Sequence, residues 1–300
     1  MSVLVVGSVA LDTIKTPLGQ CRRVLGGSAT YSSVSASFFS PVNLVAVVGA
    51  DFPKVHINLL QKKGINLEGL EIKKNGKTFS WEGEYSWDFS DPKTIATHLN
   101  VFSQFDPKIP KEYKNSEFLF LANIDPQIQA EVLKQINEPK LVVCDTMNYW
   151  IESSRSQLVK LLKDIDVFLL NESEARQLSG ETVIVKAARA IAKMGPKKII
   201  IKKGEHGSIL FSNKSVFSVP AYLLESIFDP TGAGDTFAGG FIGYLAKNKK
   251  VNENTIRRAI VYGSIMATFA VEDFSLGRLG NITPDDIKAR YEKFKALTCF

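Results

Sequence analysis

An aspartate stands directly after a glycine-rich turn at Asp229-Pro230-Thr231-Gly232-Ala233-Gly234-Asp235, and an apolar segment with helical spacing follows at once. Glycines let the backbone turn tightly and expose successive N–H groups, and the start of a helix adds positive dipole character at the same point. This combination favours an anion such as phosphate. A carboxylate beside that anion is unfavourable unless it has a use, because Asp235 would repel the bound charge.

The acid and the anion site can serve one reaction, phosphoryl transfer to an alcohol. Asp235 would accept the proton of a substrate hydroxyl as a general base, while the amides of Gly232, Ala233 and Gly234 stabilise the charge on the transferred group. The alternative is structural: Asp235 caps its helix and the glycines only form a turn.

A second polar group, Asn171-Glu172-Ser173-Glu174, follows the apolar run at residues 167–170 and opens a helical pattern. Asn171 and Glu174 have the spacing of a capping box, which is a structural role. Their amide and carboxylate oxygens also suit a hard cation such as Mg²⁺, bound directly or through water. The residues alone leave both interpretations open.

A third group, Lys202-Lys203-Gly204-Glu205-His206-Gly207, lies between the apolar runs at 199–201 and 208–211. Gly204 and Gly207 permit a close backbone approach to a nucleotide. The ammonium of Lys202 could reach a phosphate, or it could be an exposed strand end.

On the substrate side of the predicted site, Asp12 ends the first strand and Gly26-Gly27 precedes a helix. Both are expected at the carboxyl edge of the sheet, where open α/β sheets bind ligands. Asp145 and Asn148 follow the apolar run at 141–143 and are expected at the same edge, in contact with phosphate or Mg²⁺.

From Asp229 through Ile242 the sequence resembles the second signature of the ribokinase-like, or PfkB, carbohydrate kinases, without a departure. The resemblance implies transfer of the ATP γ-phosphate to an alcohol, usually the hydroxymethyl group of a sugar or nucleoside. It implies that Asp235 is the catalytic base and the 232–234 backbone the anion hole. It also implies that Asp12 binds a substrate hydroxyl, and that Asn171 and Glu174 hold Mg²⁺ through water.

The same resemblance implies a set of nucleotide-side residues, which are Lys202, Gly204, Gly207, Thr231, Gly263 and Ala267. Gly263, Met266 and Ala267 fall on one predicted helix, at positions that resemble those of the adenine pocket in similar proteins. Asp229 and Thr231, with the backbone around Ala270 and Gly277, resemble the monovalent-cation site of K⁺-activated relatives.

The acceptor side departs from the family pattern, because the chain reads Gly26-Gly27-Ser28-Ala29-Thr30-Tyr31 where relatives usually have asparagine at the last position. A phenol in place of an amide changes which hydroxyls can be bound and how much room remains. Ribokinase itself is therefore not expected, and sugar, cyclitol and nucleoside acceptors stay open. The alternative function is a non-catalytic sugar or nucleotide sensor with the same fold.

Short apolar runs alternate with segments of helical spacing, and this alternation must position the polar groups. The predicted strands are residues 3–9, 42–48, 118–121, 141–143, 167–170, 199–201 and 208–211. The predicted helices are residues 52–63, 127–136, 153–162, 183–194, 236–247, 253–270 and 284–297. Such a pattern indicates a mostly parallel sheet covered on both faces, a three-layer αβα sandwich, in a single domain over residues 1–300.

Two segments, residues 13–24 and 69–87, break this rhythm with polar and aromatic alternation, and Asn75-Gly76 is typical of a hairpin turn. We interpret them as insertions that form a small β-sheet lid, a homodimer surface or both. Trp81, Tyr85 and Trp87 on this lid could close over a substrate ring or line a dimer contact.

The composition limits the classes of partner that are expected. The formal charge is +6 and the pI about 9.0, but the lysines are scattered as short pairs, so a nucleic-acid partner is not expected. The three cysteines have no spacing typical of disulfides or zinc. No segment has the signature of a signal peptide or a membrane span, which predicts a cytoplasmic protein without a membrane partner.

Overall fold

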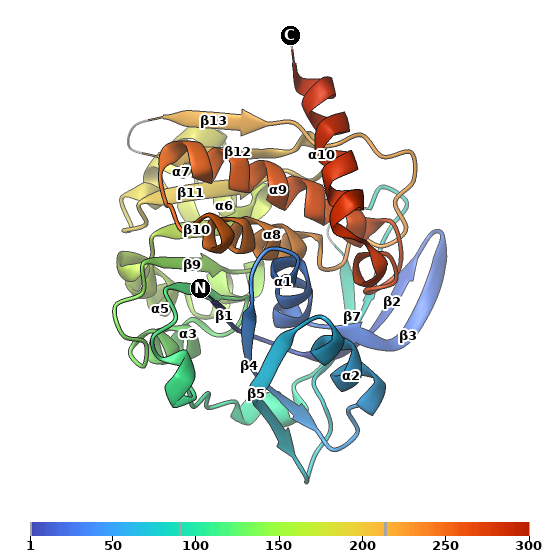
Figure 1. The fold of residues 1–300 in the computed structure, drawn as a ribbon. Helices are drawn as coiled ribbons and strands as arrows, with labels where there is room; N and C mark the ends of the chain where they lie inside the picture. Colours follow the sequence, from blue (N-terminus) through green and yellow to red (C-terminus); the bar gives the residue numbers. More distant parts are fainter. Residues whose placement is uncertain (1, 90–91, 213–214, 300) are drawn as a thin grey trace.

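Two β-sheets and the helices packed on them form the protein, and the computed structural model describes residues 2–89, 92–212 and 215–299. The large sheet has nine strands in the order β13-β12-β11-β10-β9-β8-β1-β4-β5 (Figure 1). All pairs from β11 to β5 are parallel, and β12 and β13 join antiparallel. Its strands are β1 (Val3–Val6), β4 (Val42–Gly49), β5 (Ile65–Lys73), β8 (Phe118–Leu121), β9 (Leu141–Asp145), β10 (Val167–Asn171), β11 (Lys198–Lys202), β12 (Ser208–Ser212) and β13 (Val216–Val219).

The helices lie on both faces of this sheet, so the predicted αβα architecture is confirmed. The described α-helices are α1 (Ser28–Ser37), α2 (Lys54–Lys62), α3 (Pro126–Leu133), α4 (Asn148–Ser153), α5 (Arg155–Leu161), α6 (Glu172–Ser179), α7 (Ile184–Ala192), α8 (Ala233–Asn248), α9 (Glu253–Val271) and α10 (Pro284–Thr298). The helix predicted at 153–162 corresponds to α5, which begins at Arg155 because Ser154 leaves the helical region with φ −135°. None of the described helices is long and apolar enough to cross a bilayer.

The sheet separates two hydrophobic cores, which explains why its strands are continuous apolar runs. In β1, Val3 and Val5 pack into one core with α1, α8 and α9, whereas Leu4 and Val6 pack into the other with α5, α6 and α7. Successive side chains of a strand point to opposite faces, so a strand covered on both sides needs an apolar residue at every position.

The smaller sheet, which we call the lid, has the order β3-β2-β6-β7. Its strands are β2 (Ala10–Thr16), β3 (Gly19–Gly26), β6 (Ser80–Glu84) and β7 (Lys93–His98). The strands β2 and β3 form the hairpin expected near residues 13–24 and lie at one side of the molecule (Figure 1).

The predicted hairpin around Asn75-Gly76 is wrong. The strand before it, β5, pairs in parallel with β4 at the edge of the large sheet, and only β6, after it, belongs to the lid. Strand β6 pairs in parallel with β2 and antiparallel with β7, and the sequence pattern did not predict β7. The turn-forming dipeptide therefore marks a crossing between two sheets: Gly76 accepts a backbone hydrogen bond from Ala50, not from a hairpin partner.

The carboxyl ends of the parallel strands meet at one edge of the large sheet, and polar residues gather there. They end or follow β8, β9, β10 and β11 and are Asn123, Asp145, Asn171 and Lys202. The chain runs from β1 toward β4 and β5 on one side and later toward β8 and β9 on the other, so the order reverses between β1 and β8. Open α/β sheets bind ligands at such a reversal.

Candidate active site

Residues 229–235, where α8 begins, include the amides predicted to bind an anion, and we call this segment the anion loop. Gly232 is the N-cap of α8 and has a left-handed backbone with φ 75°. The ring of Tyr31, from α1, lies directly against it: a β-carbon on Gly232 would lie 2.4 Å from Tyr31 Cδ2. Only glycine meets both the conformational and the spatial requirement.

The three amides of this loop are not equivalent. The N–H of Ala233 donates to the Pro230 carbonyl at 3.2 Å and closes the turn. Within the described chain, the N–H groups of Gly232 and Gly234 have no backbone acceptor, as is usual at a helix start. The sequence prediction is thus corrected at one position: Gly232 and Gly234 are available to an anion, whereas Ala233 is engaged in the turn.

Asp235 occupies the first turn of α8 and is partly buried. Burial raises the pKa of Asp235 to about 7; the Asp145 carboxylate adds to this rise and the Lys202 ammonium opposes it. A carboxyl group that titrates near neutral pH can both take up and release a proton, which suits a general base.

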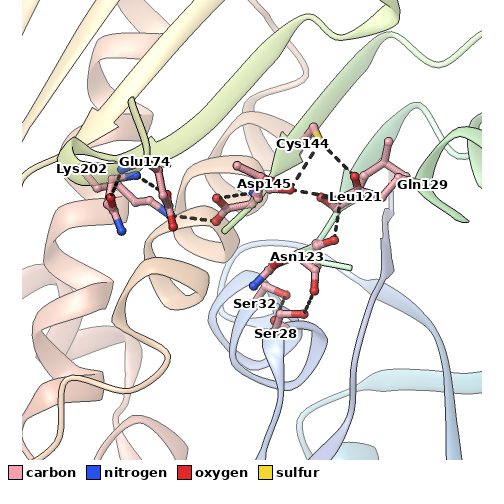
Figure 2. A network of polar contacts seen from close by, with 12 residues as sticks. Ser28, Ser32, Leu121, Asn123, Gln129, Cys144, Asp145, Glu174 and Lys202 are labelled. Carbon is pink, nitrogen blue, oxygen red and sulfur yellow. Dashed lines mark hydrogen bonds and ion pairs between the residues drawn. The ribbon is translucent and has the colours of Figure 1, made fainter. Parts of the chain in front are cut away.

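Lys202 is not an exposed strand end, because its ammonium forms an ion pair with Asp145 at 2.8 Å. The side chains of Lys202 and Asp145 are 17% and 3% exposed. Figure 2 shows Asp145 between Lys202 on one side and the Cys144 and Gln129 pair on the other. Asp145 is thus paired with Lys202, and its contact with phosphate or Mg²⁺ stays a prediction. Asn148 lies exposed at the start of α4.

On the acceptor side, Asp12 belongs to β2 of the lid and not to the end of the first strand, which corrects the sequence prediction. It is 4% exposed, and its Oδ1 atom is buried without a partner in the described chain. A β-carbon on Gly26 would lie 1.9 Å from Asp12 Oδ2, and one on Gly27 would lie 2.5 Å from the Ser8 carbonyl oxygen. Gly26 is therefore needed for β3 to approach this carboxylate, and Gly27 is needed for the start of α1 to approach the backbone of Ser8 and Ala10.

Tyr31 is 1% exposed, and its hydroxyl also lacks a partner among the described residues. Burial raises the pKa of Tyr31 well above its usual value, and Asp229 and Asp12 contribute in the same direction. The phenol is therefore a neutral donor near two carboxylates.

Sequence reasoning missed a serine and asparagine group at the strand-order reversal. Ser8 and Ser28 hydroxyls lie 3.1 Å apart, and Ser28 Oγ donates to the Asn123 carbonyl at 3.3 Å. Asn123 Oδ1 is buried without a partner in the described part of the chain. Asn123 follows the apolar run at 118–121, the same signal that identified Asn171, so it could have been found.

Comparison with known proteins decides the family. The model of the PfkB family of carbohydrate kinases matches residues 2–277. The chain belongs to this family. A cytidine kinase of Thermococcus kodakarensis is 29% identical over 259 residues, which cover 84% of this chain and 91% of that protein.

Solved structures confirm the ribokinase-like fold of this PfkB kinase. A nucleoside kinase from Burkholderia thailandensis, in complex with inosine, superposes with a TM-score of 0.78 at 19% identity and covers 97% of this chain and 96% of that one. An E. coli protein assigned as a ribokinase II, in complex with ATP and Mg²⁺, has a TM-score of 0.79 at 18% identity, with coverage of 97% and 99%.

The Mg²⁺ residues predicted for the PfkB kinase do form a capping box. Asn171 Oδ1 accepts the Glu174 amide at 2.7 Å, and Glu174 Oε2 accepts the Asn171 amide at 2.6 Å. No cluster of three or more acidic, cysteine or histidine side chains suited to a metal occurs among the described residues. This donor set fits Mg²⁺ only through water and substrate phosphates, which is how Mg²⁺ is commonly held in kinases. Metal binding by Asn171 and Glu174 stays a prediction.

The other nucleotide-side residues of the kinase have structural roles that are visible. Gly204 and Gly207 shape the turn between β11 and β12, where Lys203 N–H donates to the Gly207 carbonyl at 2.7 Å. Gly263 lies where α9 meets α8, because a β-carbon there would be 2.8 Å from the Phe237 carbonyl oxygen. Met266 is fully buried and Ala267 partly so. Nucleotide contacts at these positions stay predictions.

Asp229 ties two loops of the kinase together. Its Oδ1 accepts the Thr231 amide at 2.9 Å and its Oδ2 accepts the Ser275 amide at 3.3 Å. Burial raises its pKa, and these hydrogen bonds oppose the rise. The predicted monovalent-cation site around Asp229 is not tested by this geometry.

Of the aromatic residues predicted on the lid, Tyr85 contacts the anion loop: its hydroxyl lies 3.1 Å from Thr231 Oγ1. Trp81 stays within the lid, where Nε1 donates to Thr94 at 3.2 Å. Trp87 is 82% exposed. The lid therefore touches the anion loop through Tyr85, and dimerisation through the lid stays a prediction.

We expect Asp12→Asn to stabilise the folded protein at pH 8. Burial raises the pKa of Asp12 to about 7 from 3.8, against the opposing Gly27 amide. The folded state thus holds a proton that the unfolded state has released, so wild-type stability falls as pH rises from about 4 to 7. An asparagine does not titrate, so the variant avoids this loss of at most about 4 kcal/mol in the free energy of unfolding. Thermal unfolding should therefore show a rise in Tm over the wild type that is larger at pH 8 than at pH 5.

Asp286→Asn is a control of opposite sign, because hydrogen bonds from Thr283 lower the pKa of the Asp286 carboxyl. Replacing this carboxylate should therefore reduce Tm at pH 8. An Asp12→Asn shift of equal size at both pH values would contradict the buried-charge explanation.

Proposed function

We propose that this PfkB kinase transfers the γ-phosphate of ATP to the hydroxymethyl group of a nucleoside, with Asp235 as general base. The observation that supports it most is the placement of one carboxyl, with a pKa of about 7, in the same first helical turn as the available Gly234 amide and close to the Lys202 ammonium. A proton acceptor and a positive, phosphate-compatible surface then serve one reacting oxygen.

The reaction would follow from this arrangement. Asp235 takes the proton of the acceptor hydroxyl as its oxygen forms a bond to the γ-phosphorus. The bond from that phosphorus to the β,γ-bridging oxygen breaks, and ADP leaves with the electron pair. The Gly232 and Gly234 amides donate hydrogen bonds that stabilise the negative charge on the oxygens of the transferred phosphoryl group. Mg²⁺, held through water near Asn171 and Glu174, would neutralise phosphate charge.

The acceptor would bind at the reversal between β1 and β8. Asp12 Oδ1, Tyr31 Oη and Asn123 Oδ1 are buried polar atoms without partners in the described chain. Leaving such atoms unpaired costs roughly 1–3 kcal/mol each, and a polyhydroxyl ligand would relieve this. Two acceptors and one neutral phenol donor suit the vicinal hydroxyls of a ribose ring.

A nucleoside is favoured over a free sugar by two observations. The similar proteins reported above include a cytidine kinase and a nucleoside kinase in complex with inosine. Tyr31 stands where the relatives usually have asparagine, which changes the hydroxyls that can be bound and argues against ribose itself as the acceptor.

A substrate panel tests the proposal. The protein with ATP and Mg²⁺ is assayed against cytidine, uridine, adenosine, inosine, ribose, fructose and myo-inositol, and the phosphorylated product is identified by mass spectrometry. We expect kcat/KM for at least one nucleoside to exceed that for ribose by about 100-fold or more. A higher value for a free sugar or cyclitol would refute the nucleoside acceptor, and no acceptor-dependent turnover at all would favour the sensor alternative.

A further inference from the structure

The ion pair between Lys202 and Asp145 joins two strands that are not neighbours. Lys202 ends β11 and Asp145 ends β9, and β10 lies between them in the sheet. Asn171, the last residue of β10, is paired in register with Lys202. Strands two apart are separated by roughly 10 Å. The lysine side chain therefore lies across the end of β10 and does not extend into solvent.

The pair is also buried, at 17% exposure for the Lys202 side chain and 3% for Asp145. Desolvating two charges offsets most of their attraction, so a buried ion pair is weak evidence for stabilisation and often can be replaced by apolar residues without loss. A second Lys and Asp pair, Lys197 with Asp166 at 2.7 Å, lies at the amino end of the same strand, with its lysine 72% exposed. The same strand thus carries one exposed and one buried ion pair, and the buried pair lies beside the candidate active site.

The ammonium of Lys202 lies against the anion loop. A β-carbon on Gly234 would be 3.0 Å from Nζ. Burial opposes the charged form of Lys202, but Asp145, Glu174 and Asp235 outweigh it and raise the pKa of Lys202. The group is thus a permanent cation next to one of the two available amides.

Asp145 is itself rigidly held. Its Oδ1 accepts the Thr146 amide at 2.9 Å, and its carbonyl accepts Gln129 Nε2 at 3.1 Å. Gln129 Nε2 donates in turn to the Ala122 carbonyl at 2.8 Å. This network of buried, satisfied polar groups leaves Oδ2 as a fixed acceptor for the lysine.

We propose that Asp145 is a positioning residue for phosphoryl transfer: it holds the Lys202 ammonium beside Gly234, so that the lysine completes the anion hole as its cationic member. Asp145 touches neither phosphate nor metal and acts through Lys202. Preorganised charge of this kind stabilises the transition state without reorganisation during the reaction. The inference rests on the proposed kinase function.

A double-mutant cycle tests the proposal, with Asp145→Asn, Lys202→Met and the double variant, each assayed for kcat and for KM of ATP with the best acceptor of the panel. We expect Lys202→Met to lower kcat about 100-fold and Asp145→Asn about 10-fold or more, with KM for ATP changed less than about threefold by Asp145→Asn. The double variant should be no slower than Lys202→Met alone, because Asp145 has nothing left to position.

Lys197→Met is the matched control, and it should leave kcat and KM unchanged. Thermal unfolding of all variants separates folding from catalysis, and the double variant, which buries no charge, is expected to fold. An unchanged kcat in Asp145→Asn, or a double variant whose loss is the product of the two single losses, would overturn the positioning role. Either result with an active wild type leaves the kinase proposal intact, whereas an inactive wild type would refute the kinase proposal itself.

Discussion

Asp235→Asn should lower kcat by about 10²- to 10⁴-fold while the affinity for ATP changes little. The substitution keeps the size of the side chain and removes the carboxylate that, in the proposed mechanism, accepts the hydroxyl proton. In the proposed mechanism the carboxyl is not a phosphate ligand. Its negative charge opposes phosphate binding, so its loss should leave ATP affinity equal or slightly improved. Single-turnover rates at saturating acceptor and equilibrium binding of ATP measure the two quantities separately.

The fold should tolerate this change. Asp235 is partly buried and its pKa is raised to about 7 by burial, so at neutral pH the folded state gains nothing from the charged form. An unfolding temperature equal to or above that of the wild type is therefore expected at pH 8. Substrate-stimulated turnover at the wild-type rate would remove Asp235 from its role as base, and parallel losses of kcat and ATP affinity would indicate a ligand instead.

Gly232→Ala should lower kcat by about 100-fold or more, because a new methyl group displaces either the loop or the Tyr31 ring. The β-carbon would lie 2.4 to 2.5 Å from three atoms of that ring, which α1 holds in the core. A shift of the Gly232 and Gly234 amides by a fraction of an ångström would misalign them with the phosphoryl group in the proposed transfer. Steady-state kcat and KM with the best acceptor of the panel measure the effect.

Gly180→Ala is the matched control. Gly180, at the end of α6, has φ 73°, close to the 75° of Gly232, but a β-carbon there meets no atom within 4 Å. Both variants therefore share the backbone strain, on the order of 1 kcal/mol, and a similar loss of unfolding temperature from that strain. Comparable activity in the two variants would show that contact with Tyr31 does not maintain the anion loop.

The lid gives a physical example of where sequence reasoning failed. Residues 69–87 were predicted as one hairpin because Asn75-Gly76 is a strong local turn signal. A turn signal indicates only that the chain changes direction. Strand β5 pairs with β4, whereas β6 pairs with β2 and β7. Strand pairing between distant segments depends on packing that no short window of sequence contains.

The capping box shows a different limit. Asn171 and Glu174 have a spacing that serves a helix start and a hydrated Mg²⁺ equally well, and the box is formed. A local role that is satisfied does not exclude a second role toward a ligand. For that reason the residues at this helix start could be identified from sequence, but their metal role could not be decided.

The amino-acid pattern was enough to predict the parallel sheet covered on both faces, since strands buried on two sides must be continuous apolar runs. It also located the glycine turn with Asp235, since those residue types are needed within one local segment. Three contacts between distant segments are visible only in the folded chain: the ion pair of Lys202 with Asp145 across β10, the contact of Tyr31 with Gly232, and the membership of Asp12 in the lid. Each of these contacts joins residues far apart in the chain, and their distances are set by how the elements pack, which local spacing does not encode.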